Sequence, residues 1–587
     1  MASSSNADLD VSKIPLYQPR HFVPPDIDLT TTTEVCALYQ KLADMPINSW
    51  ADMEAFLVDW SELESVVSEH AVVLCIRMTC QTDDLTRGEA FRHFTQQVLP
   101  AIKPLEHRLK AKLVSFYDTT APPNDRYVVL IRNARADVEL FRQENVLLQK
   151  REDALIQDYQ TVCGAMMVEF QGRQFTMPQM GHKLAEPDRA LREAAWRAAT
   201  QRRQQDTGRL DDIFDGMIAL RHEIALNAGE PNYRDYKFKE WHRFDYTPDD
   251  CNCYHNAVIE IAVPAFGRIL RHRQQAMHLD TTRPWDFFPV QPADPYGRAP
   301  LHPFTQVEDL VSGIRNIVRR LNPDFGRLIA EMDALGLLDL ASRKGKAPGG
   351  YQESLEERRQ QFIFGNVVGS NDDVYLLLHE GGHVFHAAAC RDEPLMAYRR
   401  HAPIEFCEVA SQGMELLGSR YLDEFYNAAD ARRAWRERLE HIVYGLIWVA
   451  NVDAFQHWIY EHPREDRQGR HEAWVQINQR FFGQFYDWSG LSEYRATAWH
   501  KQLHIFQVPF YYIEYGIAQL GALGIWLQAQ DDLDAAVNHY RAALALGGSK
   551  PLPELFAAAG LEFDFSARTV GPLVEAVMNE WEKVRNA

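Results

Sequence analysis

The stretch "LLLHEGGHVFH", residues 376–386, combines an apolar run with three histidines, one glutamate and two adjacent glycines. Ser370 and the acidic residues after it supply N-cap side chains and first-turn negative charge, so a helix is predicted to begin near residue 371. On this helix His379 and His383 stand four residues apart and project from one face, one turn above the other. This spacing allows both imidazoles to hold one metal ion.

The pattern H-E-x-x-H is typical of zinc peptidases, in which the glutamate between the histidines, here Glu380, serves as general base. The alternative is a helix whose histidines are ordinary core or surface groups. That alternative explains Gly381 and Gly382 poorly, because each glycine inside a helix costs about 1 kcal/mol relative to alanine. We expect a substrate or a second helix to pass close to them, although tight packing without function fits as well. His386 is not followed by the metzincin pattern and is interpreted as a packing or ligand-supporting residue.

A catalytic zinc site usually has three protein ligands and an open position for water, so a third ligand is needed. The segment "APIEFCEVASQGMELLGSRYL", residues 402–422, carries Pro403 near its start and shows helical periodicity. It offers Glu405, Glu408 and Glu415, the last two of which lie seven residues apart on one face. Spacing alone does not choose among these glutamates.

Most of the remaining sequence has apolar residues at three- and four-residue spacing, which predicts a mainly helical protein. One example is residues 210–229, whose final Gly229 is suited to a helix C-cap. The best strand candidates are "RYVVLIR" (126–132) and "RQQFIFGNVV" (359–368), and the second leads directly to the histidine helix. A small β-sheet beside the metal site is therefore expected.

A domain boundary is placed near residue 205 on the basis of a charged run at residues 192–206. It divides the chain into an N-terminal helical domain, residues 1–205, and a catalytic domain, residues 206–587.

The net charge of -20, from 82 acidic and 62 basic residues, disfavours a phosphate backbone or an anionic membrane as a partner. Neither nucleic acid nor membrane is expected, and the oligomeric state stays open.

The N-terminal stretch lacks a secretory-signal pattern, and no apolar run reaches membrane-spanning length. The eight cysteines are scattered, which indicates reduced thiols and the cytoplasm. The pair "CNC" at 251–253 has no second pair at zinc-ribbon spacing, so no structural zinc is expected there.

Three segments together resemble the M3 family of zinc metallopeptidases: "HEGGHVFH" (379–386), "EFCEVASQGMELL" (405–417) and "HIFQVPFYYIEYGIAQLGALGIW" (504–526). The resemblance is closest to bacterial oligoendopeptidases of the F type, with thimet oligopeptidase as a more distant relative, and is most specific over residues 360–525. It implies helical lobes that enclose a channel, which admits short unfolded peptides and excludes folded proteins. It also implies one zinc ion per chain.

The resemblance implies that Glu408 is the third zinc ligand beside His379 and His383. Glu415 would then accept a hydrogen bond from a ligand imidazole and hold its tautomer.

The same resemblance assigns a catalytic role to His504 and to a tyrosine pair three residues apart, Tyr512 and Tyr515, as hydrogen-bond donors to the developing oxyanion. The chain departs from thimet oligopeptidase because it has "IFQVP" where that enzyme has a glycine-rich loop. Pro509 is predicted to open the next helix, and Tyr511 is interpreted as a core aromatic. His500, four residues before His504, is not expected to form a second metal pair with it.

The sequence thus predicts a zinc endopeptidase in which Glu380 takes a proton from water and later delivers it to the leaving amine. The strand-like "FIFGNVVG" is expected to pair its backbone with an extended peptide. Two alternatives stay open. One is a zinc carboxypeptidase or dipeptidyl carboxypeptidase, which needs a cation such as Lys501 for the substrate carboxylate. The other is a noncatalytic helical peptide-binding protein, against which the presence of Glu380 argues.

Overall fold

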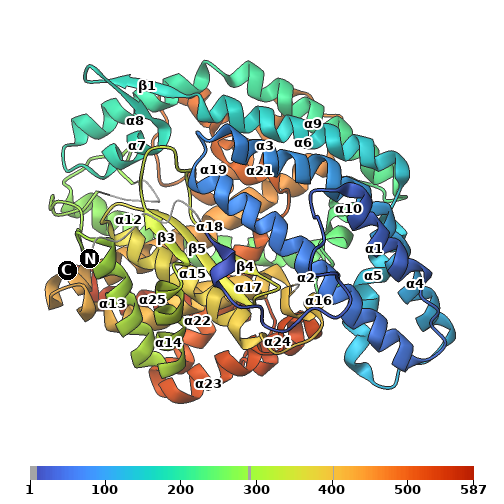
Figure 1. Ribbon diagram of the computed structural model, residues 1–587. Coiled ribbons are helices and arrows are strands. Elements are labelled where there is room, and N and C mark those ends of the chain that lie inside the picture. The colour runs from blue at the N-terminus through green and yellow to red at the C-terminus, as the bar shows by residue number, and fades with distance from the viewer. Residues whose placement is uncertain (1–8, 288–292, 401) are drawn as a thin grey trace. The chain divides into compact units, whose positions relative to one another are not determined.

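The computed structural model describes residues 9–287, 293–400 and 402–587 (Figure 1). Helices dominate it and the strands form two small sheets, which confirms the mainly helical fold class. The first eight residues of the N-terminal stretch lie outside the described residues. The chain divides into two compact units of three segments each: unit 1 is Met1–Glu139, His302–Asn427 and Gly521–Phe563, and unit 2 is Leu140–Leu301, Ala428–Leu520 and Asp564–Ala587.

Unit 1 holds the histidine motif on one of its helices and places a three-stranded sheet beside it. Its helices are α1 (Thr32–Asp44), α2 (Trp50–Cys80), α3 (Leu85–His93), α4 (Leu99–Thr119), α5 (Val128–Leu140), α13 (Val307–Leu321), α14 (Pro323–Ala334), α15 (Asn371–Ala389), α16 (Met396–Arg400), α17 (Ile404–Gly418), α23 (Leu533–Leu544) and α24 (Leu552–Ala558). Its strands are β3 (Leu338–Ala341), β4 (Tyr351–Leu355) and β5 (Gln360–Val367). Helix α22 (Ile513–Asp531) contributes residues to both units.

Strand β5 confirms the strand predicted over residues 359–368, but its place in the sheet differs from the expectation. The strand order is β3-β5-β4, with β3 parallel and β4 antiparallel to β5. Because Ile363 and Phe364 of β5 are paired on both sides, the expectation that this part of "FIFGNVVG" offers its backbone to a peptide is wrong. Strand β4 lies at one edge of this sheet, and Gln352 on it pairs with Ile363 of β5.

The strand predicted over residues 126–132 is wrong. This segment forms a 3₁₀ turn (Asp125–Tyr127) followed by the start of α5. Ile131 and Ala134, three residues apart, are both buried in the apolar core that α1, α2 and α4 also line. Burial of this helical face outweighs the β preference of the valine and isoleucine residues, which amounts to about 1 kcal/mol across the whole scale.

Helix α15 begins at Asn371, as predicted, and its start is tied to the end of β5. The carboxylate of Asp373 accepts hydrogen bonds from the backbone N–H groups of Ser370 (2.8 Å) and Val368 (2.9 Å). These donors would otherwise be unsatisfied at a helix N-terminus. The sheet and the histidine helix are thereby held in one arrangement.

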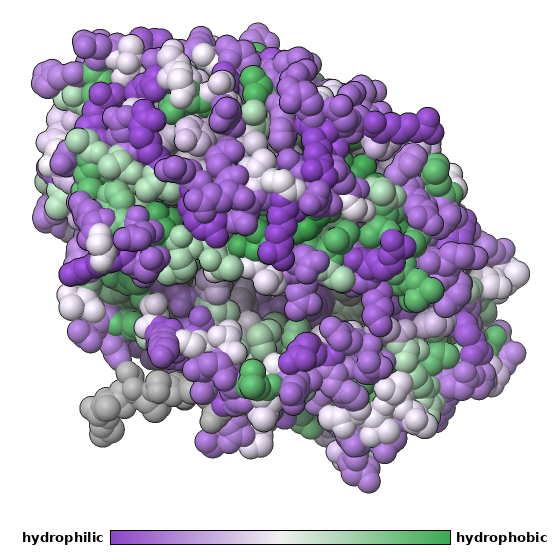
Figure 2. Space-filling model, turned by 90° about the horizontal axis from the view of Figure 1, so that it is seen from above, coloured by the Kyte–Doolittle hydropathy of each residue, from purple (hydrophilic) through white to green (hydrophobic). Residues whose placement is uncertain are grey.

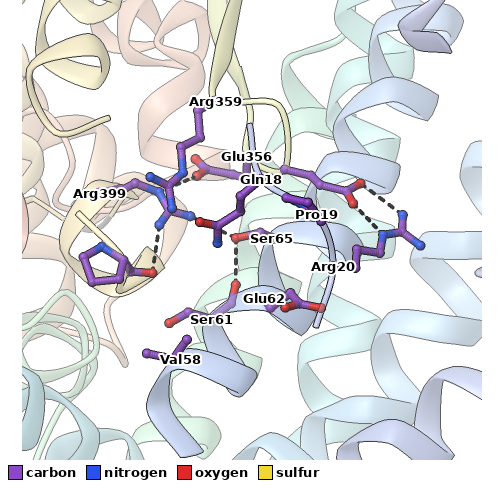
Figure 3. A pocket seen from close by; sticks show the side chains of 12 residues that line it. Gln18, Pro19, Arg20, Val58, Ser61, Glu62, Ser65, Glu356, Arg359 and Arg399 are labelled. Atoms are coloured by element: carbon purple, nitrogen blue, oxygen red, sulfur yellow. Dashed lines mark hydrogen bonds and ion pairs between the residues drawn. The ribbon is translucent and has the colours of Figure 1, made fainter. Parts of the chain in front are cut away.

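The N-terminal segment of unit 1 is fastened by ion pairs around a small polar pocket (Figure 3). Arg20 contacts Glu357, in the turn between β4 and β5, with Nε 2.5 Å from Oε1. On the other side of the pocket Arg399 approaches Glu356, with Nε 3.4 Å from Oε2. Segments far apart in sequence are joined by these pairs.

The described residues of unit 2 form long helices and one β-hairpin. Its helices are α6 (Gln143–Gly164), α7 (Met177–His182), α8 (Arg189–Gln204), α9 (Thr207–Asn227), α10 (Tyr233–Glu240), α11 (Pro248–Ala257), α12 (Val263–Ala276), α18 (Ala428–Glu461), α19 (Arg467–Phe482), α20 (Ser492–Ala496), α21 (Leu503–Gln507) and α25 (Ala567–Val584). The hairpin strands are β1 (Met167–Phe170) and β2 (Arg173–Thr176). Helix α9 ends as predicted, because Gly229 adopts a φ of 87° directly after its C-cap residue Ala228.

Hydrophilic side chains cover most of the face drawn in Figure 2, as 25% charged residues lead one to expect. Among the described residues, no helix is long and apolar enough to cross a membrane. The domain boundary at residue 205 stays a prediction.

Candidate active site

Helices α15 and α17 pack against each other in unit 1 and bring the three predicted metal ligands together. The Nε2 atom of His379 lies 3.4 Å from Oε2 of Glu408, and Nε2 of His383 lies 4.0 Å from the same oxygen. The three ligand atoms all lie within 4.8 Å of one another. Two imidazole nitrogens and one carboxylate oxygen are a donor set that zinc takes in catalytic sites, so these residues fit a zinc ion.

Further residues of α17 hold the ligands in position. The Nδ1 atom of His379 donates to Oε1 of Glu415 at 2.8 Å, which leaves Nε2 as the coordinating nitrogen. The hydroxyl of Ser411 donates to Oε2 of Glu408 at 2.9 Å. The geometry thus agrees with the supporting position expected of Glu415 and adds Ser411, which the sequence reasoning missed. Its spacing of three residues after Glu408 on one helix is the signal that points to it.

The two glycines of the motif have different surroundings. A Cβ atom on Gly382 would lie 2.5 Å from Cα of Ser411 and closer still to the carbonyl oxygen of Ala410, distances that real Cβ atoms essentially never show. A Cβ on Gly381 would meet only the ring of Phe385, at 3.7 Å. Gly382 is therefore required by the close approach of α17, whereas helix packing does not require Gly381.

Glu380, between the two histidines in the sequence, is 5% exposed. Burial raises the pKa of its carboxyl to about 7, and the charge of His379 and a hydrogen bond with the Gln352 backbone oppose that rise. A carboxyl group with a pKa near neutrality can both accept and donate a proton. Strand β4 contributes to this environment through Gln352.

The ligand histidines have different protonation preferences because their neighbours differ. Burial disfavours the charged form of His379, but the hydrogen bond to Glu415 and the charge of Glu408 outweigh it and raise the pKa to about 9. Burial lowers the pKa of His383 to about 4. His386 is buried, its pKa is lowered by burial to about 3, and its ring lies 6.2 Å from that of Phe406. A packing role for His386 agrees with the prediction.

The structure gathers His504, Tyr512 and Tyr515 into a second group, in unit 2. The ring centroid of His504 lies 4.7 Å from that of Tyr512 and 6.0 Å from that of Tyr515. The predicted helix start at Pro509 is wrong: α22 begins at Ile513, so Tyr512 precedes it and Tyr515 lies in its first turn. The intervening turn contains Phe510, whose φ of 65° is incompatible with a continuous helix.

A chain of hydrogen bonds sets the tautomer of His504. The indole N–H of Trp448 donates to Oε1 of Gln502 at 3.1 Å, and an indole can only donate. The other amide atom of Gln502 is therefore its NH₂ group, which donates to Nδ1 of His504 at 2.7 Å. A neutral His504 consequently carries its proton on Nε2.

Tyr512 is linked to the same chain. Burial raises the pKa of Tyr512 to about 12, against hydrogen bonds from Trp448 and Gln502. Neither of these two supporting residues was found from the sequence. Gln502 stands two positions before His504, which is a weak signal, and Trp448, distant in the sequence, offers none.

The same segment contains His500, Lys501 and Tyr511. His500 Nε2 lies 2.9 Å from Oδ1 of Asp211, so it does not form a pair with His504. The Lys501 ammonium lies 5.3 Å from the ring centroid of Trp448. Tyr511 is only partly buried, and its ring centroid lies 5.4 Å from that of Tyr515, 6.0 Å from that of His504 and 6.1 Å from that of Trp241, so its interpretation as a core aromatic stays a prediction.

Two histidines and a glutamate on packed helices, with a buried non-ligand glutamate between the histidines, define a metallopeptidase site. The chain belongs to peptidase family M3, whose model matches residues 183–570, and it is a metallopeptidase.

Solved structures agree with this assignment. One assigned to oligoendopeptidase F is 26% identical with a TM-score of 0.87, covering 98% of this chain and 99% of the other. The fold is also that of PZ peptidase A with an inhibitor (24% identity, TM-score 0.87, 98% and 99% covered) and of an oligoendopeptidase F from Bacillus anthracis str. Ames (22%, 0.82, 96% and 98%). A search of curated proteins finds no match.

Proposed function

We propose that this protein is a zinc-dependent endopeptidase that hydrolyses internal bonds of short unfolded oligopeptides. The observation that carries the proposal is the meeting of His379, His383 and Glu408 beside Glu380, whose pKa lies near neutrality. Membership of family M3 and similarity to a structure assigned to oligoendopeptidase F support it.

In this proposal His379, His383 and Glu408 hold one zinc ion, which supplies a Lewis acid for activating water and polarising the scissile carbonyl. Glu380 removes the proton from the attacking water and carries it to the leaving amine. Burial raises the pKa of the Glu380 carboxyl, which favours its protonated form and supports delivery of the proton to the leaving amine.

We further propose that His504, Tyr512 and Tyr515 donate hydrogen bonds to the oxygen of the scissile carbonyl as it becomes negative. The support is the tautomer of His504, since Gln502 leaves the proton on Nε2. The edge strand β4, rather than β5, is proposed to pair with the backbone of an extended peptide. Residue Gln352 on β4 already interacts with Glu380, which supports this choice.

Product mapping tests the proposed specificity. The zinc-loaded enzyme is incubated with peptides of graded length and one folded protein, and the products are identified by mass spectrometry. Internal cuts confined to short peptides, and lost after chelation, are expected. Release of single residues or dipeptides from C-termini alone would favour the carboxypeptidase alternative, with Lys501 as a candidate cation. The absence of all cleavage would favour a peptide-binding protein.

The proposed compartment is the cytoplasm, a choice that the scattered cysteines support. No nucleic acid or membrane partner is proposed.

Replacing Gln502 by leucine is expected to lower kcat/KM by about 100-fold, because His504 loses the bond that keeps its proton on Nε2. Steady-state kinetics measure the loss, and Gln507→Leu, at the end of the short helix that follows Gln502, is the matched control. If Gln502 acts through His504, adding His504→Ala to Gln502→Leu should cost little more than either change alone. Additive losses of kcat/KM in the double variant would contradict the proposal that Gln502 acts through His504.

Replacing Glu415 by alanine is expected to weaken zinc binding by about 10- to 100-fold, because His379 loses the acceptor of its Nδ1–H group. Competition with a chromophoric chelator measures the affinity. Glu415→Gln keeps a neutral acceptor and should lose less. Equal affinities for wild type and Glu415→Ala would contradict the role assigned to Glu415.

A further inference from the structure

A second set of metal-binding side chains lies in unit 2, where α11 packs against α18. Cys251 and His255 stand four residues apart on α11, and Asp453 and His457 stand four residues apart on α18. Each pair therefore presents its side chains from one helix face. These four residues, called the α11–α18 cluster below, are all buried, with exposures between 0% and 4%.

Three members of the cluster have ligand atoms as close together as those of the active site. The candidate atoms of Cys251, Asp453 and His457 lie within 4.8 Å of one another. Oδ2 of Asp453 lies 2.8 Å from Nε2 of His255 and 3.3 Å from Nε2 of His457. Ligands bound tetrahedrally to zinc at their usual bond lengths are about 3.3–3.8 Å apart, so the atoms of Cys251, Asp453 and His457 are spaced to surround one ion.

The cluster also contains buried polar atoms that the protein does not satisfy. Among the described residues, Nδ1 of His457 and Oδ1 of Asp453 have no hydrogen-bond partner. The rings of Phe238 and Phe510 lie against His457, with centroids 6.1 Å and 5.3 Å away. An unpaired polar atom in such apolar surroundings is costly, and a metal ion would satisfy it.

We propose that the α11–α18 cluster is a closed structural zinc site that fastens α11 to α18. The donor set of one sulfur, two imidazoles and one carboxylate suits zinc, in which thiolate and imidazole are the preferred ligands. Four protein ligands leave no position for water, so the site is structural. The motif "CNC" contributes Cys251 alone, because Cys253 is exposed on the other side of α11.

Metal content provides the first test. Wild-type protein is expected to contain two zinc ions per chain by mass spectrometry of the metal, and a variant with His379→Ala and His383→Ala is expected to keep one. A wild type with a single zinc ion that this variant lacks would overturn the proposal. The result does not depend on peptidase activity, so failure of this site and failure of the proposed function are distinguishable.

Cobalt replacement provides a test that is specific for the thiolate, since none of the proposed active-site ligands is a cysteine. Protein produced with Co²⁺ is expected to show the near-ultraviolet charge-transfer absorption of a cobalt–thiolate bond. Cys251→Ser should lose this absorption and one metal ion per chain, whereas Cys253→Ser, the matched control, should keep both. Absorption that persists in Cys251→Ser, or is missing from wild type, would overturn the proposal. If Cys251→Ser does not fold, the test uses wild type and Cys253→Ser, both of which should show the cobalt–thiolate absorption.

Discussion

Replacing Glu380 by glutamine is expected to lower kcat/KM by about 1,000-fold, within the range of 10²–10⁴ typical of general acid–base catalysis. Glutamine has nearly the same shape, so the packing of α15 is preserved. It cannot take a proton from water, so the chemical step loses its base. Because Glu380 does not belong to the group of three ligands, the zinc content should stay unchanged.

Kinetics and metal analysis of the same preparation separate chemistry from binding. Glu405→Gln is a matched control, since Glu405 is also a buried glutamate but lies outside the ligand group. It should keep most of the activity. A Glu380→Gln enzyme that retains more than about one tenth of the wild-type rate would contradict the assignment of Glu380 as general base.

Replacing Gly382 by alanine is expected to destabilise unit 1 by about 3 kcal/mol, the upper part of the range for overpacked cores. The neighbours that must move are backbone atoms of Ala410 and Ser411, which yield less easily than a side chain. Moving α17 away from α15 also displaces Glu408 from the two histidines. Zinc binding should therefore weaken together with stability.

Gly381→Ala is the matched control, because only the ring of Phe385 lies near its added methyl group, at ordinary contact distance. This change should leave stability unchanged or raise it by up to about 1 kcal/mol through the higher helix propensity of alanine. Urea unfolding monitored by circular dichroism compares the two variants. Similar stabilities for Gly381→Ala and Gly382→Ala would contradict the close helix contact as the reason for Gly382.

Sequence reasoning could predict the features of the site that depend on residues close together in the sequence. The start of α15 near residue 371 follows from side chains within one turn, and the meeting of His379 with His383 follows from helical spacing. Glu408 was one of three candidates by spacing, and the family resemblance singled it out. Its approach to the histidines depends on Gly382, whose role in helix packing the sequence left open.

The parts that could not be predicted depend on contacts between distant residues. The segment over residues 126–132 has strand-forming side chains but is helical, because its buried face completes a core shared with other helices. The central position of β5 follows from pairing with two strands, whose partners a single sequence does not reveal. The link from Trp448 through Gln502 to His504 joins α18 to the segment before α21.

The three-segment composition of each unit has a consequence for synthesis. At about 5–20 residues per second, a ribosome needs roughly half a minute to two minutes for a chain of this length. His379 and Glu408 leave the ribosome well before Tyr540, whose hydroxyl donates to the carbonyl oxygen of Ala410 between the two metal helices. Unit 2 is completed later still, because it also contains α25. Unit 1 is not complete before Phe563 is synthesised, nor unit 2 before the segment Asp564–Ala587, so a shorter nascent chain has little opportunity to act as a protease on its neighbours.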